Sequence, residues 1–238
     1  MKRSSYLFAL SILSYFCQTP TNSFGQSNFG SVDPFLPLFG TYQVHYERKI
    51  LDRLSVVGGV GLKASSGIFE INGLQTESIN LNDVDFSGYK ILPEVRWYVS
   101  KEDPGLWGFY AGLYYKYQKN SSNITGSYTS SDGSLVMVDM DLMLHSNTFG
   151  IELGYKLKVW KNLFADFIIA GPGLSAQRAI ITENVQLPEK FYERFNEAAD
   201  NYSVLKDLEP KLNFTKEDLD TKFITPHFRY GIKLGWAF

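Results

Sequence analysis

Three histidines and a serine are the side chains of this sequence that could perform hydrolytic chemistry. Ser146 follows His145, and a serine, a histidine and a carboxylate can hydrolyse an ester when hydrogen bonds connect them. His45 and His227 lie on other segments, and no G-x-S-x-G, H-E-x-x-H or Walker-type motif occurs. We therefore predict no catalytic residues, no cofactor, no metal site and no enzymatic activity, and keep a lipid-modifying enzyme as an alternative.

Charged residues alternate with apolar residues along several segments. From Pro226 to Phe238 every second residue is apolar or aromatic, and Arg229 and Lys233 lie between them. Strict alternation predicts a β-strand with one apolar and one polar face, here at 224–238. The same reading predicts further strands at 38–50, 54–63, 87–100, 107–118, 146–159 and 163–170.

The length of these strands and their aromatic ends indicate a membrane. Most run about 10–13 residues, and a tilted strand crosses a bilayer in roughly 9–11 residues. Tyr46, Trp97, Trp107, Trp160 and Trp236 lie near strand ends, where an interfacial belt of aromatic residues is expected. A sheet in lipid must close on itself, because an open edge would leave backbone groups without partners. The sequence therefore predicts an all-β fold, an antiparallel transmembrane β-barrel.

The polar face of the strands is expected to point into the barrel. Charges of both signs nearly balance there, and buried charges are tolerated when they are paired. An eight-stranded barrel is only wide enough for side chains to fill it. We predict a lumen filled by ion pairs, with no wide pore, formed by Glu47, Glu94, Arg96, Lys116, Glu152, Lys156, Asp166, Arg229 and Lys233.

Composition excludes several other classes of protein. The 238 residues carry 23 Lys+Arg against 25 Asp+Glu, so a nucleic-acid partner, which needs a concentrated basic face, is not expected. One Cys excludes a disulfide scaffold. Lys2 and Arg3 precede an apolar stretch at 6–17, and Ser23 and Gly25 are small. We predict a signal peptide at 1–25, cleaved before Gln26, and a barrel at 26–238.

Short and long connections alternate, as in outer-membrane barrels. The turns at 51–53, 100–106 and 160–162 are short, and the connections at 64–87, 119–145 and 171–222 are long. If the short turns are periplasmic, seven strands run from 38–50 to the C-terminus. An eighth, irregular strand is expected near 28–37, which contains Pro34 and Pro37. Ten strands remain an alternative if residues 177–186 form a hairpin.

Two long connections have patterns of their own. Residues 135–144 alternate, which predicts that the flanking strands continue outward as a hairpin turned at Ser131-Asp132-Gly133. Residues 188–208 carry apolar side chains at helical spacing, which predicts a helix within an insert at about 187–210. This helix either packs on the protein's own hairpin or binds a partner.

Several segments resemble the small outer-membrane β-barrel proteins of Gram-negative bacteria. These are residues 40–50, 92–100, 108–118 and 227–238, together with the signal peptide. The chain has an OmpA/OmpX-like size and is most similar to an uncharacterised family of the Bacteroidetes-type envelope. The resemblance implies an outer-membrane location and no established biochemical role. It also implies a C-terminal signal for the barrel-assembly machinery, formed by Tyr230, Ile232, Leu234, Trp236 and Phe238.

The sequence thus predicts a monomeric outer-membrane protein with a structural or surface-interaction role. Its expected partners are outer-membrane lipid and the assembly machinery, and through the loops a surface protein or lipopolysaccharide. A soluble, lipocalin-like ligand-binding barrel is the alternative from a different class. That barrel would place its aromatic residues inside and its charges outside.

Overall fold

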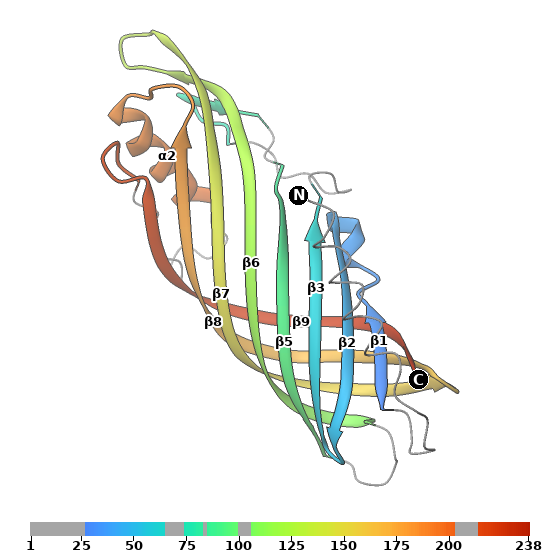
Figure 1. The fold of residues 1–238 in the computed structure, drawn as a ribbon. Helices are drawn as coiled ribbons and strands as arrows, with labels where there is room; N and C mark the ends of the chain where they lie inside the picture. Colours follow the sequence, from blue (N-terminus) through green and yellow to red (C-terminus); the bar gives the residue numbers. More distant parts are fainter. Residues whose placement is uncertain (1–26, 65–73, 83–84, 100–105, 203–213) are drawn as a thin grey trace, which may run out of the picture.

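The computed structural model describes residues 27–64, 74–82, 85–99, 106–202 and 214–238. The predicted signal peptide lies outside these residues. The described strands are β1 (Asn28–Val32), β2 (Thr41–Leu51), β3 (Leu54–Lys63), β4 (Ile79–Leu81), β5 (Ser87–Tyr98), β6 (Gly108–Thr129), β7 (Leu135–Trp160), β8 (Leu163–Glu183) and β9 (Asp220–Ala237). A 3-10 helix, η1 (Leu36–Phe39), precedes β2, and the α-helix α2 (Glu189–Tyr202) lies between β8 and β9 (Figure 1).

Eight of these strands close into an antiparallel ring, as the alternation predicts. Each of β2, β3, β5, β6, β7, β8 and β9 pairs with its neighbour in the chain, apart from β4. The ring closes because β1 pairs with both β2 and β9. The short strand β4 lies outside the ring, on the far end of β6, where Ile79 faces Tyr128. The eight-stranded prediction is therefore confirmed.

The first strand is shorter than predicted, and its sequence explains why. β1 ends at Val32, and Pro34 and Pro37 follow. Proline has no backbone N–H to donate to a neighbouring strand, so the ladder cannot continue through these positions. The chain turns through η1 instead, and Gly40, with φ of 67°, leads into β2. The predicted strands at 28–37 and 38–50 are thus corrected to Asn28–Val32 and Thr41–Leu51.

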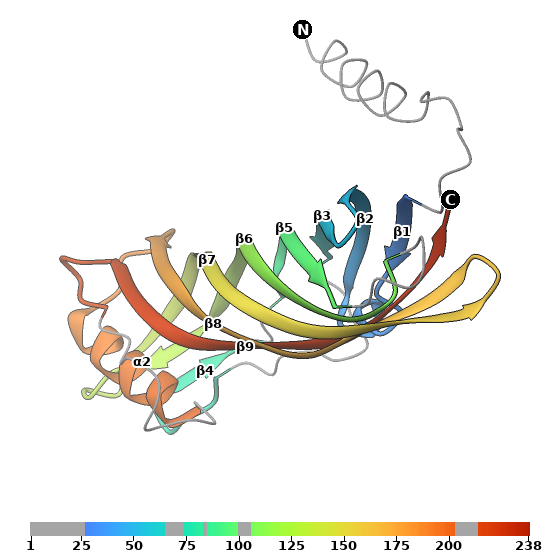
Figure 2. The same ribbon diagram turned by 90° about the horizontal axis from the view of Figure 1, so that it is seen from below.

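One side of the barrel is much taller than the other. β2, β3 and β5 have 11, 10 and 12 residues, whereas β6, β7 and β8 have 22, 26 and 21. At about 3.3 Å per residue, the long strands extend well beyond the short ones. Figure 2 shows α2 and β4 at the far end of these extensions, away from β1 and the C-terminus.

The extensions correct the alternative count of ten strands. Residues 177–183 do not form a separate hairpin, because they continue β8, and Gln177 pairs with Phe223 of β9. The predicted turn at 131–133 is present between β6 and β7. There Gly133 has φ of 83°, and the carboxylate of Asp132 accepts a hydrogen bond from the backbone N–H of Ser134 at 3.0 Å.

The predicted helix packs against its own chain. α2 spans Glu189–Tyr202, and residues 203–213 of the predicted insert lie outside the described residues. Buried apolar side chains of α2 meet those of β4 and of the extensions of β6, β7 and β8. We call this group the outer cluster, and its buried members are Ile79, Leu81, Ile124, Tyr128, Val138, Met140, Ala179, Ile181, Leu187, Phe191, Tyr192, Phe195 and Phe214.

Candidate functional site in the barrel interior

Charged side chains fill the middle of the barrel. We call this group the lumen cluster, and it consists of Glu47, Glu94, Arg96, Glu152, Lys156, Asp166, Arg229 and Lys233. Arg96 lies at its centre, with a side chain only 1% exposed. Its guanidinium donates to Glu94 at 2.5 Å and to Asp166 at 2.7 Å. The ion pairs therefore connect strands that lie apart around the barrel.

A second arginine and two lysines complete the lumen cluster. Arg229 donates to Glu152 at 2.7 Å and to Glu94 at 2.6 Å, so it joins β9 to β7 and β5. The Lys156 ammonium lies 2.5 Å from Glu47. Lys233 lies 3.5 Å from Glu94. Four cations thus face four carboxylates, and this balance lets the charges stay buried.

Aromatic side chains lie below the lumen cluster, toward the end with the short turns. Phe29, Tyr98, Trp107, Tyr110 and Phe164 are buried together there, and the ring of Phe29 meets those of Trp107 and Phe164 edge to face. The hydroxyl of Tyr98 donates to Glu47 and that of Tyr110 to Asp166, both within 2.8 Å. The two groups therefore form one packed interior.

Lys116 is the predicted network member that the structure does not bring into the lumen cluster. Its ammonium lies 3.3 Å from Nε2 of His227 and forms no ion pair with a described carboxylate. The alternation of the sequence places Lys116 on the polar face. It does not give the distance of Lys116 from Glu94 and Glu152, because the tilt of the strands decides which inward side chains lie at the same level of the barrel.

The histidines do not form the hydrolytic arrangement that the sequence could have allowed. Ser146 and His145 are neighbours on one strand, so their side chains point to opposite faces. Ser146 bonds Ser175 at 2.8 Å, and His145 lies 3.5 Å from the hydroxyl of Tyr117. His45 bonds Asp33 at 2.7 Å. No group of His, Cys, Asp and Glu that could hold a metal ion occurs among the described residues.

The outside of the barrel wall is apolar. The residues of the predicted assembly signal, four on β9 and Phe238 directly after it, are all exposed, from 36% for Ile232 to 77% for Tyr230, whereas Lys233 is 1% exposed. The same belt continues around the ring with Val44, Val60, Val95, Leu113, Phe149, Ile151, Leu153 and Ile169. A soluble, lipocalin-like barrel has the opposite arrangement, with its charges on the outer face.

This polarity reverses along single strands. On β7, the inward side chains Glu152 and Lys156 are charged, but Val138 and Met140, which lie on the same face, are apolar. On the outward face of β6, Leu113 is exposed and apolar, whereas Asn123 and Ser127 are polar. The unbroken register between β6 and β7 shows that neither strand has slipped. The surroundings of the wall must therefore change from lipid to water along the strand.

The fold and this polarity define a membrane β-barrel. No helix in the described part of the chain is long and apolar enough to cross a bilayer. No protein-family model matches the sequence, and no curated protein matches it. Among solved structures, the chain is similar to CarO of Acinetobacter baumannii, with 8% sequence identity and a TM-score of 0.41 over 92% of this chain and 100% of that one.

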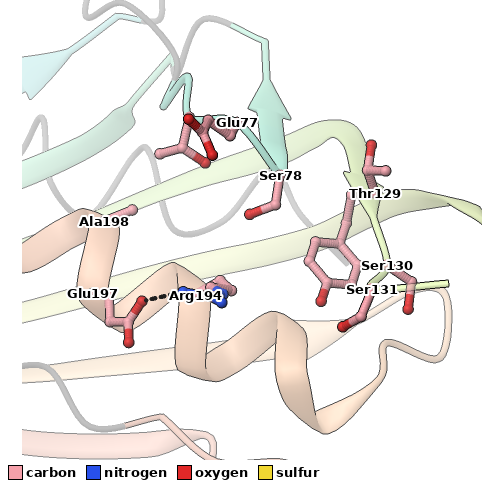
Figure 3. Close-up of a pocket in the computed structure, with 10 residues that line it drawn as sticks. Glu77, Ser78, Thr129, Ser130, Ser131, Arg194, Glu197 and Ala198 are labelled. Atoms are coloured by element: carbon pink, nitrogen blue, oxygen red, sulfur yellow. Dashed lines mark hydrogen bonds and ion pairs between the residues drawn. The ribbon is translucent and has the colours of Figure 1, made fainter. Parts of the chain in front are cut away.

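The outer cluster confirms the predicted packing of the helix on the protein's own hairpin, because it joins α2 to β6 and β7. Sequence reasoning did not find the contribution of β4 to the outer cluster. A hollow of about 500 Å³ lies beside it, between α2 and the ends of β4 and β6 (Figure 3). Ser78, Thr129 and Ser131 border this hollow on one side, and Arg194 and Glu197 of α2 form an ion pair at 3.0 Å on the other. The reversal of polarity after residue 119 is a further signal in the sequence for this unit.

Proposed function

We propose that the protein is an integral outer-membrane protein whose barrel anchors a folded unit at the cell surface. This outer unit comprises the extensions of β6, β7 and β8, together with β4 and α2. The observation that carries the proposal is the reversal of polarity along β6 and β7. On β6 both faces exchange character without a change of register, which is expected where a strand passes from lipid into water.

The orientation follows from the connections. The turns at 52–53 and 161–162, β1 and the C-terminus lie at one end of the barrel, and the outer unit lies at the other. Outer-membrane barrels have short periplasmic turns and long extracellular loops. The outer unit is therefore extracellular in this proposal. The exposed C-terminal residues would be read by the assembly machinery, and the outer unit would meet a surface protein or lipopolysaccharide.

The filled interior supports an anchor that forms no wide pore. The lumen cluster and the aromatic residues below it fill the cross-section with side chains that are nearly all buried. Ions would have to displace paired charges to pass, which is costly in a low-dielectric interior. The role that fits is mechanical support and surface interaction.

Two measurements test this function. The protein should remain with detergent-extracted outer membrane, and its band should shift on a gel when the sample is boiled. In planar bilayers, the purified barrel should give no large, stable conductance. A freely soluble periplasmic protein would contradict the location, and steps of porin size would contradict the filled lumen. Cross-linking through α2 in intact cells would then identify what the outer unit contacts.

A further inference from the structure

Part of β9 has no strand partner on the side of β1, and we call this part of the barrel wall the gap. β1 pairs with β9 only from Phe29–Ala237 to Val32–Leu234. Above this point β9 continues to Asp220 and β2 continues to Thr41, but no described strand lies between them (Figure 1). Residues 33–40, with η1, occupy this part of the wall. The gap arises directly from the two prolines that end β1.

A cavity of about 600 Å³ passes through this gap. Its lining includes Phe228 and Tyr230, which point outward from β9, and His227 and Arg229, which point inward from the same strand. The lining thus includes residues of both faces at the unpaired edge of β9, which places the cavity between the barrel interior and the outer surface of the wall. Its volume lies within the range of about 300–1,000 Å³ that is usual for small-molecule sites.

The two ends of the cavity differ in chemistry. At the outer end lie the apolar side chains of Phe35, Leu36, Phe39, Phe228 and Ile232. At the inner end lie Lys90, Lys116, His227 and Arg229, with Gln43 and Asp33. The inner end therefore combines the three cations Lys90, Lys116 and Arg229 with the buried apolar side chains of Leu92 and Ile168, and the outer end presents a surface continuous with the lipid-facing belt.

Two of the cations form no direct ion pair with a described carboxylate, although Asp33 attracts Lys90 electrostatically. Arg229 is neutralised by Glu94 and Glu152, but neither Lys90 nor Lys116 forms an ion pair among the described residues. Asp33, the one carboxylate in the lining, bonds His45 at 2.7 Å. Partly buried ammonium groups are costly unless an opposite charge compensates them, so this end of the cavity favours an anion.

We propose that this cavity binds a long-chain fatty acid that enters sideways from the membrane. The carboxylate would lie between Lys90 and Lys116, and the acyl chain would lie along η1 and the outward side chains of β9. This inference uses the membrane location of the proposed function and adds a ligand to it.

The test measures binding of cis-parinaric acid, a fluorescent fatty acid, to the full chain folded in zwitterionic detergent. The double variant Lys90→Gln/Lys116→Gln should bind at least tenfold more weakly. The matched control is Lys158→Gln/Lys161→Gln, which removes the same charge from exposed positions outside the cavity lining and should bind as the parent does. The proposal is overturned if Lys90→Gln/Lys116→Gln binds cis-parinaric acid with an affinity within twofold of that of the parent.

A second variant fills the cavity without removing a charge. A Cβ on Gly231, which lines the cavity, would meet nothing nearer than Asp33 at 4.0 Å, so Gly231→Phe should fold and block binding. Gly58→Phe is its control, because Gly58 also has open space around it but lies outside the cavity lining. Equal binding by the two phenylalanine variants contradicts the proposed position of the ligand.

Competition identifies the head group. Palmitate should displace the probe, and uncharged methyl palmitate should displace it at least tenfold less effectively. Displacement by lysophosphatidic acid but not by palmitate overturns the assignment of a carboxylate. Every variant is first checked for the gel shift on boiling. A protein that shows this shift and binds no probe refutes the ligand while leaving the outer-membrane anchor intact.

Discussion

The lumen cluster and the outer cluster share the inward face of β7 and β8, yet their chemistry is opposite. β7 contributes Glu152 and Lys156 to the first and Val138 and Met140 to the second. In the barrel, the outward face is the one that must be apolar, so polar side chains are left to fill the inside. Beyond the membrane the outward face meets water, and hydrophobic burial again drives the inside together.

The two clusters are therefore stabilised in different ways. The lumen cluster depends on complementary charges, and removing one partner leaves other charges buried without compensation. The outer cluster depends on apolar area and packing, in which a truncated side chain leaves a cavity. Single substitutions in each cluster separate these two mechanisms.

Arg96→Met should be the most damaging substitution. It leaves Glu94, Glu152 and Asp166 without their central cation. Breaking a buried ion pair costs about 3–5 kcal/mol, and we expect a loss of at least that order in the free energy of unfolding, measured with urea in lipid vesicles. Arg178→Met is the control. Its pair with Asp220 is about half exposed, so the loss should stay below about 1 kcal/mol. Similar losses for both variants would mean that the buried ion pairs of the lumen cluster contribute no more to stability than a half-exposed ion pair.

Phe191→Ala should loosen the outer cluster and leave the barrel folded. Phe191 is fully buried and packs against Tyr128 and Phe195. We expect a local loss of about 3 kcal/mol, seen as faster proteolysis of the α2 segment, with an unchanged gel shift on boiling. Glu193→Ala, on the exposed side of α2, should have little effect. Loss of the barrel's gel shift in the Phe191 variant would show that the two regions fold as one.

A pair of arginine substitutions locates the boundary between lipid and water on β6. Leu113 and Ser121 lie on the same outward face, eight residues apart. Leu113→Arg should cost about 2–4 kcal/mol near the middle of the bilayer, and Ser121→Arg should cost about 0–1 kcal/mol. Urea unfolding in vesicles measures both. Equal losses in the free energy of unfolding at the two positions would mean that the boundary between lipid and water does not lie between Leu113 and Ser121.

A small pH effect should be confined to the outer unit. Hydrogen bonds from Asn184 and Asn123 lower the pKa of Asp139 below its usual value. A lowered pKa in the folded state stabilises the fold at pH values above the unfolded pKa of about 3.9, and this contribution is lost as the pH falls through the folded value. Hydrogen exchange at Asn184 and Val185, corrected for intrinsic rates, should therefore speed up below about pH 4.

Asp139→Asn should abolish most of that pH dependence, and Glu217→Gln, at an exposed position without a described side-chain hydrogen bond, should preserve it. An unchanged pH profile in the Asp139 variant would assign the effect to another group.

Much of the barrel could be predicted from sequence because alternation has a direct geometric meaning. Arg229 and Lys233 alternate with apolar residues, and a period of two can only place them on the opposite face. The count of eight strands followed from the alternation of short and long connections. The composition of the lumen cluster was predictable for the same reason, apart from Lys116.

The rest depended on contacts between distant segments. Strand tilt decides that Arg229 reaches Glu94, 135 residues away, while Lys116 meets His227, and no local pattern encodes this. The outward hairpin at 135–144 and the helix were predicted, but the hairpin side chains that meet α2 were not, because Val138 and Met140 acquire an inward direction only once β7 is seen as continuous with the barrel. β4 has three residues, too few for a period to be recognised.

The most direct test of the account is a depth profile along the outward face of β6. Single cysteines at Phe109, Leu113, Tyr117, Ser121 and Thr125, in the chain from Gln26 onward, which has no cysteine of its own, would carry a spin label in lipid vesicles. We predict that oxygen, which concentrates in lipid, relaxes the labels at 109, 113 and 117, and that a water-soluble nickel complex relaxes those at 121 and 125. Nickel access at all five positions would contradict a membrane around this wall.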